Sequence, residues 1–410
     1  MFFSQFRLCH VVALVLATSC NVTWAKEQVP LNTKHNSPQP LRQYSWVRSF
    51  ASIGDSYAAG LGAGNRIDWS CSRYDHSYPS LLNSNGFLGE NPNRTHQYLA
   101  CSGATSEEVL VKQASALDDD LDVITVSAGG NDVGLSIIMN QCIYQFFMSK
   151  TDACEDALNE TWSKIENDLS GNLTALLDVL KPKLNKGHGK IYYTGYARFF
   201  ATDDEICDNV TWAVWSYESQ SAKQFLTLER RKIMNDMVQA VNKKIEEAVH
   251  KAGDQVIFVD YDSFVAENKG RFCEAGVIEP DPNRNGLCFY EWKTVDTGDN
   301  STALHHAGDD VPKGSFESDI VEWTNKTLQE HPDWKFGPDE EVELDADKKG
   351  GRQVIGDTVS WLLPDFWKRV FHLRPAGHLL IAHLLMSKLA ETASKISASE
   401  TVEGYASRDD

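Results

Sequence analysis

Short apolar runs alternate along the chain with longer stretches in which apolar residues recur every three or four positions. The runs lie at 49–54, 97–100, 122–127, 190–194 and 255–260. Such short runs between turn residues predict buried strands, and the longer stretches at 157–184, 228–252 and 376–394 have the spacing of amphipathic helices. Strand and helix in alternation predict an α/β fold. We expect a three-layer α/β/α sandwich around a mostly parallel five-stranded sheet of flavodoxin-like order.

The two ends of the chain depart from this pattern. Residues 1–25 contain one basic residue, no acid and an apolar run at 11–17, which predicts a secretory signal peptide that is removed after Ala25. Residues 26–44 are polar and contain proline, so we expect a flexible lead-in, and residues 399–410 form a polar tail. Between them, 45–398 is expected to be one domain.

An irregular acidic insertion interrupts this domain at about 279–351. The segment is rich in Gly, Pro and Asp and includes the acidic run 339–347. Long irregular segments in compact domains are usually functional or mobile. The pattern fits a solvated surface insertion and a lid equally well.

Cysteine usage agrees with export. Seven of the nine cysteines lie after the signal peptide, at 71, 101, 142, 154, 207, 273 and 288, without the paired spacing of a zinc site. Scattered cysteines in an exported chain predict disulfides. The simplest pairs are Cys71–Cys101 and Cys142–Cys154. Cys207 is expected to pair with Cys273 or Cys288, and the sequence leaves this choice open.

Glycosylation signals and net charge complete the outline of a secreted protein. Sequons for N-glycosylation occur at Asn93, Asn159, Asn172, Asn209, Asn300 and Asn325. The formal net charge is −19, or −20 without the signal peptide, and no Lys/Arg cluster offsets it locally. Such a chain repels nucleic acid and anionic membranes. No stretch after the signal peptide approaches the about 20 apolar residues of a membrane span, and we expect a monomer.

Four short motifs along the chain carry candidate catalytic residues. They are Gly54-Asp-Ser56-Tyr, Cys101-Ser-Gly103-Ala-Thr, Gly129-Gly-Asn131-Asp132 and Phe371-His372-Leu-Arg-Pro-Ala-Gly377-His378. Three of them directly follow a predicted strand, so they project to one rim of the sheet. Acyl transfer needs a nucleophile, a base within reach and donors aimed at the developing oxyanion. Ser56, a late His, Gly103 and Asn131 offer these groups.

In these blocks the chain resembles the SGNH hydrolases, also called GDSL lipases and esterases. The resemblance extends from Gly54 to His378 and implies that Ser56 is the nucleophile and His372 the general base. It implies an oxyanion hole made by the backbone N–H groups of Ser56 and Gly103 and the side-chain amide of Asn131. No cofactor is expected.

One position departs from that family's pattern. The family often has an Asp three residues before the catalytic His, where this chain has Arg369. A guanidinium cannot accept a hydrogen bond from the imidazole. The secreted actinobacterial esterases, which the cysteines also resemble, use a main-chain carbonyl here, so we expect the Arg369 carbonyl to orient His372. The carboxylates of Asp365 and Asp357 are the alternatives.

Two other histidine positions invite comparison with His372. His378 follows Pro375 in the first turns of the terminal helix, where a packed histidine is the default. The pair His305-His306 lacks further spaced ligands, so we expect no metal site.

The expected function is therefore that of a secreted esterase that hydrolyses carboxylic esters through an acyl-serine intermediate. Acetylated carbohydrates or short acyl esters are the first choice of substrate, and acyl lipids, as for a lipase or phospholipase, are the alternative. A non-catalytic binding protein on the same fold would be expected to lose Ser56, Asn131 or His372, and all three are present.

Overall fold

The computed structural model describes residues 43–68, 70–84, 86–144, 152–212, 223–291, 294 and 369–406. The strands are β1 (Ser49–Gly54), β2 (Arg66–Asp68), β3 (Arg73–Tyr74), β4 (Thr95–Tyr98), β5 (Val123–Ser127), β6 (Lys190–Thr194) and β7 (Val256–Val259). The α-helices are α1 (Ser56–Ala59), α2 (Tyr78–Leu82), α3 (Ser106–Glu108), α4 (Leu135–Ile138), α5 (Ala153–Asn167), α6 (Leu169–Leu180), α7 (Leu228–Ala252), α8 (Asp262–Glu267) and α13 (Pro375–Ala406). The π-helices are η2 (Val109–Gln113) and η4 (Met139–Tyr144), and the short 3₁₀ helices are η3 (Ala114–Ala116) and η5 (Lys181–Lys183).

Five parallel strands form the main sheet in the order β4-β1-β5-β6-β7. Numbered by their order in the chain, these strands run 2-1-3-4-5, so the predicted flavodoxin-like order is confirmed. The strand order reverses between β1 and β5, and open α/β sheets bind ligands at the carboxyl ends of the strands beside such a reversal. Ser56 and Asn131 follow these two strands.

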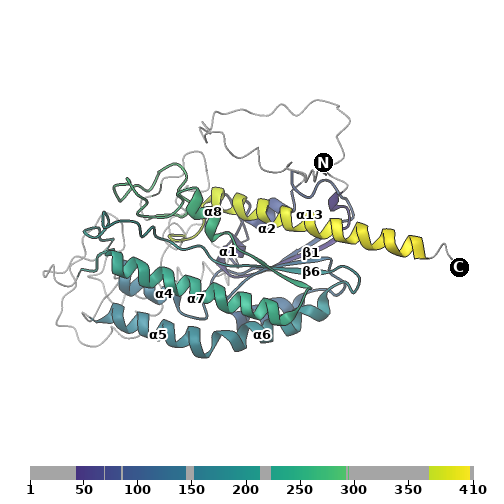
Figure 1. Cartoon of the computed structure of the whole chain (residues 1–410), viewed down its shortest axis with the longest axis horizontal. Coiled ribbons are helices and arrows are strands. Elements are labelled where there is room, and N and C mark those ends of the chain that lie inside the picture. Colours follow the sequence, from purple (N-terminus) through teal and green to yellow (C-terminus); the bar gives the residue numbers. More distant parts are fainter. Residues whose placement is uncertain are drawn as a thin grey trace, which may run out of the picture. The chain divides into compact units, whose positions relative to one another are not determined.

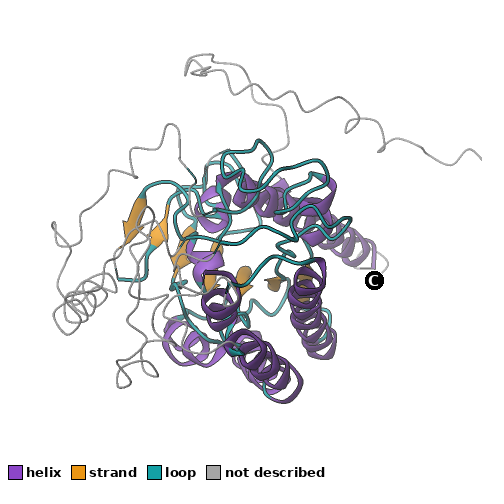
Figure 2. Ribbon diagram, turned by 90° about the vertical axis from the view of Figure 1, so that its left-hand side faces the viewer, coloured by secondary structure: helices purple, strands orange, loops and turns teal. Residues whose placement is uncertain are grey.

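Helices cover both faces of the sheet, as the alternation of the sequence predicted. Figure 1 shows α2, α8 and α13 above the strands and α4, α5, α6 and α7 below them, and the turned view of Figure 2 also has helices on both sides. Every residue of β5 is buried, because this strand lies in the middle of a sheet covered on both faces. Within the described residues, no helix is both long and apolar enough to cross a membrane.

The predicted elements match the observed ones except at one strand and two helices. The strand predicted at 97–100 is β4, which begins and ends two residues earlier. The helical stretch 157–184 is two helices, α5 and α6, which meet at Asp168. Asp168 ends α5 by donating its N–H to the Lys164 carbonyl, and its own carbonyl accepts the N–H of Gly171. The terminal helix continues to Ala406, so most of the expected polar tail is helical. The acidic insertion at 279–351 lies outside the described residues after 291, apart from residue 294.

Candidate active site

The turn after β1 holds Ser56 in a fixed position. Gly54 ends the strand with φ +134°, and a Cβ there would lie 2.1 Å from the Ser127 carbonyl oxygen, so only glycine fits. Asp55 caps α1 by accepting the Tyr57 N–H at 3.0 Å. Its own N–H donates to the Ser127 carbonyl at 2.9 Å, which joins the turn to β5. Ser56 is therefore the first residue of a capped helix at the rim of the sheet.

His372 lies beside this serine although 316 positions separate them. Its Nε2 atom is 2.6 Å from Ser56 Oγ, which is hydrogen-bonding distance. The two residues thus have the geometry of a nucleophile and its base.

The loop that carries His372 has an uncommon backbone. Phe371 has φ +65°, a left-handed conformation that is costly for a residue with a side chain. Main-chain hydrogen bonds with Tyr290 hold the loop on both sides, from Phe371 N–H to the Tyr290 carbonyl at 2.8 Å and from Tyr290 N–H to the His372 carbonyl at 2.9 Å. The Tyr57 hydroxyl also donates to the Phe371 carbonyl at 2.9 Å. Tyr57 is the neighbour of Ser56, so it ties the loop directly to the turn that carries Ser56.

The carbonyl that faces His372 Nδ1 belongs to Val370 and not to Arg369, where the sequence placed it. The Nδ1 atom is 3.3 Å from the Val370 oxygen. The Arg369 carbonyl instead accepts the His372 N–H at 2.8 Å and closes the turn. The Arg369 guanidinium lies 4.3 Å from the centre of the Tyr290 ring and donates to the Thr294 carbonyl at 3.2 Å. An Nδ1–H that donates to Val370 leaves Nε2 as the acceptor for the Ser56 hydroxyl, the arrangement that a general base needs. Asp365 and Asp357 lie outside the described residues.

Two main-chain donors and one amide make up the predicted oxyanion hole. Gly103 has φ +81°, and its loop is fastened through the disulfide between Cys101 and Cys71. Within the part of the chain that the structure describes, the N–H groups of Ser56 and Gly103 donate to no protein acceptor. Asn131 Nδ2 donates one hydrogen to the Ala104 carbonyl at 3.0 Å, and its second hydrogen remains for another acceptor.

Asp132 fixes the Asn131 block from the side. Its carboxylate accepts the N–H of Ser106 at 2.8 Å and the side-chain amide of Asn172 at 3.0 Å. The block is thereby fastened to α3 and to α6.

Tyr196 joins the Ser56 and Asn131 blocks from behind. Its hydroxyl donates to Asp55 Oδ2 at 2.5 Å and accepts the Gly130 N–H at 3.1 Å. Burial raises the pKa of the Asp55 carboxyl to about 6, and its hydrogen bonds act in the opposite direction. The sequence marks Tyr196 only by its place just beyond the carboxyl end of β6, so this residue was not predicted.

His378 is a packed histidine inside α13, as the sequence indicated. Its side chain is buried, and Nδ1 lies 3.4 Å from the Tyr78 N–H, where it accepts a hydrogen bond. Burial lowers the pKa of His378 to about 3, so the ring is neutral. It is not the histidine that contacts Ser56.

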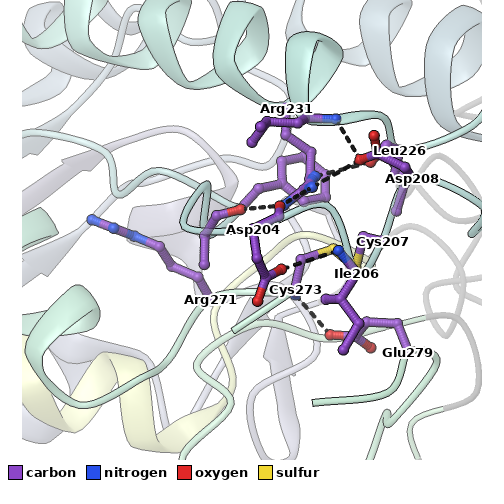
Figure 3. Close-up of a disulfide and its surroundings, with 12 residues drawn as sticks. Asp204, Ile206, Cys207, Asp208, Leu226, Arg231, Arg271, Cys273 and Glu279 are labelled. Atoms are coloured by element: carbon purple, nitrogen blue, oxygen red, sulfur yellow. Dashed lines mark hydrogen bonds and ion pairs between the residues drawn. A yellow bond between two sulfur atoms is a disulfide. The ribbon is translucent and has the colours of Figure 1, made fainter. Parts of the chain in front are cut away.

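The structure contains three disulfides. Two are the short-range pairs expected from the sequence, and the third joins Cys207 to Cys273 and leaves Cys288 as a buried thiol. Figure 3 shows the third bridge beside the buried Arg231, whose guanidinium donates to the Ala201, Asp204 and Leu226 carbonyls and pairs with Asp208. The loop before α7 is thus fastened to the loop after α8.

The asparagine side chains of the predicted glycosylation sites differ in their exposure to solvent. Asn93, Asn159 and Asn209 are exposed. Asn172 is half-buried in α6 and its amide is engaged with Asp132, so it is poorly placed for a glycan. Asn300 and Asn325 lie outside the described residues, as do His305 and His306. Among the described residues, no group of three or more His, Cys, Asp or Glu side chains is arranged to hold a metal ion.

Comparison with known proteins finds similarity to lipases in part of the chain. The model of the GDSL-like Lipase/Acylhydrolase family matches residues 52–277. Lipase 1 of Streptomyces coelicolor is 28% identical over 199 residues, which cover 48% of this chain and 66% of the relative. A lipase of Streptomyces rimosus is 28% identical over 153 residues, which cover 37% of this chain and 53% of the relative. The chain thus spans less than two thirds of either relative. The crystal structure of the extracellular lipase from S. rimosus superposes with a TM-score of 0.44 at 23% identity, covering 55% of this chain and 85% of that one.

Proposed function

Because the chain belongs to the GDSL-like lipase/acylhydrolase family, we propose that it is a secreted serine hydrolase that cleaves carboxylic esters through an acyl-Ser56 intermediate. The observation that carries this proposal is the 2.6 Å contact between Ser56 Oγ and His372 Nε2. A serine hydroxyl is a weak nucleophile at neutral pH, and an adjacent base is what activates it.

The first half of the reaction transfers the acyl group to the enzyme. His372 Nε2 takes the hydroxyl proton while Ser56 Oγ attacks the ester carbon. The oxyanion accepts hydrogen bonds from the Ser56 N–H, the Gly103 N–H and the Asn131 amide. Each of these bonds stabilises the transition state most, because the negative charge develops there. The intermediate then collapses, the bond to the alcohol oxygen breaks, and His372 returns the proton to that oxygen.

The second half releases the acid. His372 takes a proton from a water molecule, which attacks the acyl-Ser56 carbonyl, and the same donors hold the second oxyanion. The bond to Ser56 Oγ breaks and the proton returns to that oxygen. The Val370 carbonyl, 3.3 Å from Nδ1, keeps the imidazole in the tautomer that both halves require.

The proposal that the protein is exported rests on features of the chain outside this site. The segment 1–25 has the composition of a signal peptide. Three disulfides within the described residues agree with an oxidising compartment. Secretion is tested by expressing the full chain in a eukaryotic host and sequencing the N-terminus of the protein in the medium, where Lys26 is the expected first residue.

The catalytic proposal is tested by the hydrolysis of p-nitrophenyl esters from acetyl to palmitoyl. Ser56→Ala and His372→Ala are expected to lower kcat by at least about a thousandfold, because nucleophile and base act as a unit. The exposed residues Ser84 and His250 provide matched controls, and Ser84→Ala and His250→Ala should retain wild-type rates. Hydrolysis that survives in purified Ser56→Ala would refute the mechanism.

A further inference from the structure

The Tyr196 hydroxyl lies between the two turns that carry Ser56 and Asn131. It donates to Asp55 Oδ2 at 2.5 Å and accepts the Gly130 N–H at 3.1 Å. Asp55 precedes Ser56 in the chain, and Gly130 precedes Asn131. The buried tyrosine therefore joins the turn of the nucleophile to the turn of an oxyanion donor through one oxygen atom.

The Asp55 carboxylate fixes the direction of both bonds. Its Oδ1 atom accepts the Tyr57 N–H and the Ser127 hydroxyl, each at 3.0 Å, and its Oδ2 atom faces Tyr196. An ionised carboxylate only accepts, so the tyrosine donates its hydrogen there and accepts the Gly130 N–H on its oxygen. A hydroxyl that donates to a charged group becomes a stronger acceptor, because linked hydrogen bonds polarise each other. The carboxylate thereby strengthens the bond to Gly130.

Helix α7 fixes the main chain of Tyr196. Asn242 accepts the Tyr196 N–H on Oδ1 at 2.8 Å and donates from Nδ2 to the Tyr196 carbonyl at 2.7 Å. Gly195 permits this close approach, because a Cβ there would lie 2.8 Å from Asn242 Oδ1. The tyrosine ring packs edge-on against Tyr57, with 5.2 Å between the ring centres. Since the main chain and the ring are both held, the hydroxyl has a defined position.

The position of Gly130 decides where the Asn131 amide points. A Cβ at Gly130 would lie 3.2 Å from Cζ of Tyr196, so the glycine lets the tyrosine approach its N–H. Asn131 donates one amide hydrogen to the Ala104 carbonyl at 3.0 Å and has the other for the oxyanion. An oxyanion donor acts well only at about 2.7–3.1 Å from the developing charge. A small shift of Gly130 therefore weakens the contribution of the amide.

We infer that the Tyr196 hydroxyl positions the oxyanion hole, because it holds Gly130 in place and so aims the Asn131 amide. Tyr196 and Asp55 touch no reacting atom in this arrangement, so they are positioning residues. A tyrosine with a purely structural role would instead satisfy the buried carboxylate and affect stability alone. The inference rests on the proposed function of Ser56.

Tyr196→Phe tests the role of the hydroxyl, because it keeps the ring. Its kcat should fall by about 10- to 100-fold, less than the loss of a whole oxyanion donor. KM should stay unchanged, because the amide contributes most in the transition state. Tyr192→Phe is the matched control, since this tyrosine lies on β6 and its buried hydroxyl bonds to Thr392 at 2.8 Å. A kcat for Tyr196→Phe within about twofold of wild type, or an equal fall in Tyr192→Phe, would overturn the inference.

A double-mutant cycle shows whether the hydroxyl acts through the Asn131 amide. The kcat is measured for the wild type, Tyr196→Phe, Asn131→Ala and the double variant. Once the amide is absent its aim no longer matters, so adding Tyr196→Phe to Asn131→Ala should lower kcat by less than about twofold. Independent effects would multiply instead. A fall as large as in the wild-type background would overturn the inference.

Asp55→Asn provides an independent test that leaves the tyrosine unchanged. The Tyr57 N–H keeps the new amide oxygen on its own side, so the amide nitrogen faces Tyr196 and can only donate. The tyrosine then loses its charged acceptor, and its bond to Gly130 weakens. We expect a fall in kcat with unchanged KM, and little further fall in the Asn131→Ala background. A kcat equal to that of the wild type would overturn the inference, even if Tyr196→Phe does not fold.

The positioning role and the proposed function fail in different ways. Effects of Tyr196→Phe and Asn131→Ala that multiply would overturn the positioning role while Ser56-dependent hydrolysis stands. Absence of hydrolysis on every ester, or hydrolysis that persists in Ser56→Ala, would instead remove the proposed function and the inference with it.

Discussion

The Tyr57 hydroxyl is expected to set the position of the base. It donates to the Phe371 carbonyl at 2.9 Å, in a buried environment, one residue before His372. Tyr57→Phe deletes this single atom and keeps the ring, which packs edge-on against Tyr196 at 5.2 Å. The change therefore removes a link between the nucleophile turn and the base loop without opening a large cavity.

The size of the effect follows from burial and backbone strain. A buried carbonyl that loses its donor costs about 1–3 kcal/mol. Phe371 already pays about 1–2 kcal/mol for its left-handed φ of +65°. A loss of 1–3 kcal/mol weakens the catalytic conformation of the loop by at most about 5- to 150-fold. We expect kcat to fall by about tenfold, with KM unchanged because the lost bond joins two parts of the protein, the Tyr57 hydroxyl and the Phe371 carbonyl.

The assay measures kcat and KM with p-nitrophenyl hexanoate, together with the rate at which a fluorophosphonate labels Ser56. Tyr192→Phe is the matched control, because its buried hydroxyl bonds to Thr392 at 2.8 Å on the face of the sheet covered by α13. It should lose comparable stability and keep its kcat. A kcat for Tyr57→Phe within about twofold of wild type, or an equal fall in Tyr192→Phe, would refute the reasoning.

Three further changes probe the oxyanion hole, the buried carboxyl and the third disulfide. Asn131→Ala should lower kcat by about 100- to 1000-fold with little change in KM, and an unchanged kcat would remove this amide from the mechanism. Burial raises the pKa of Asp55 from 3.8 to about 6, so the folded state holds the proton more tightly than the unfolded state. The raised pKa adds about 3 kcal/mol to the free energy of unfolding below about pH 4, and this contribution is lost as pH rises through 6. Urea unfolding of the wild type across this range should show the fall, and Asp55→Asn should not show it. The double variant Cys207→Ser, Cys273→Ser opens a separation of 66 residues, so its unfolding free energy should drop by about 4 kcal/mol in the chain-entropy model, and a drop below 1 kcal/mol would contradict it.

Most of the sheet and the turn that carries Ser56 were predictable because local signals mark them. The strands β1, β5, β6 and β7 are largely apolar runs that end at turn residues, whereas the polar edge strand β4 was placed two residues too late. Gly54 is required by the close approach of Ser127. The helix at 228–252 was predicted to the residue, because its apolar spacing and the Gly253 after it agree. The break at Asp168 was missed because apolar spacing continues across it.

Contacts between distant parts of the chain could not be read from one sequence. The hydrogen bond from Tyr57 to Phe371 spans 314 positions, and that from Tyr196 to Asp55 spans 141. The residue type of Phe371 does not predict its left-handed backbone conformation. That turn brings the Val370 carbonyl, and not that of Arg369, to His372, which explains the shift of one residue from the prediction.

The apolar cavity beside α7 also depended on tertiary structure. The apolar residues of α7 predicted a buried helix face, and this reading holds for most of them. The spacing does not reveal that Met234, Met237 and Val241 leave a narrow space against η4.

Mass spectrometry of the acyl-enzyme is the most direct test of the central claim that Ser56 is the nucleophile. The protein is mixed with p-nitrophenyl octanoate, quenched in acid within the burst, and digested. The account predicts one octanoyl group per chain on the peptide that contains Ser56, and none in Ser56→Ala. An octanoyl group on another residue, or full turnover by Ser56→Ala, would contradict it.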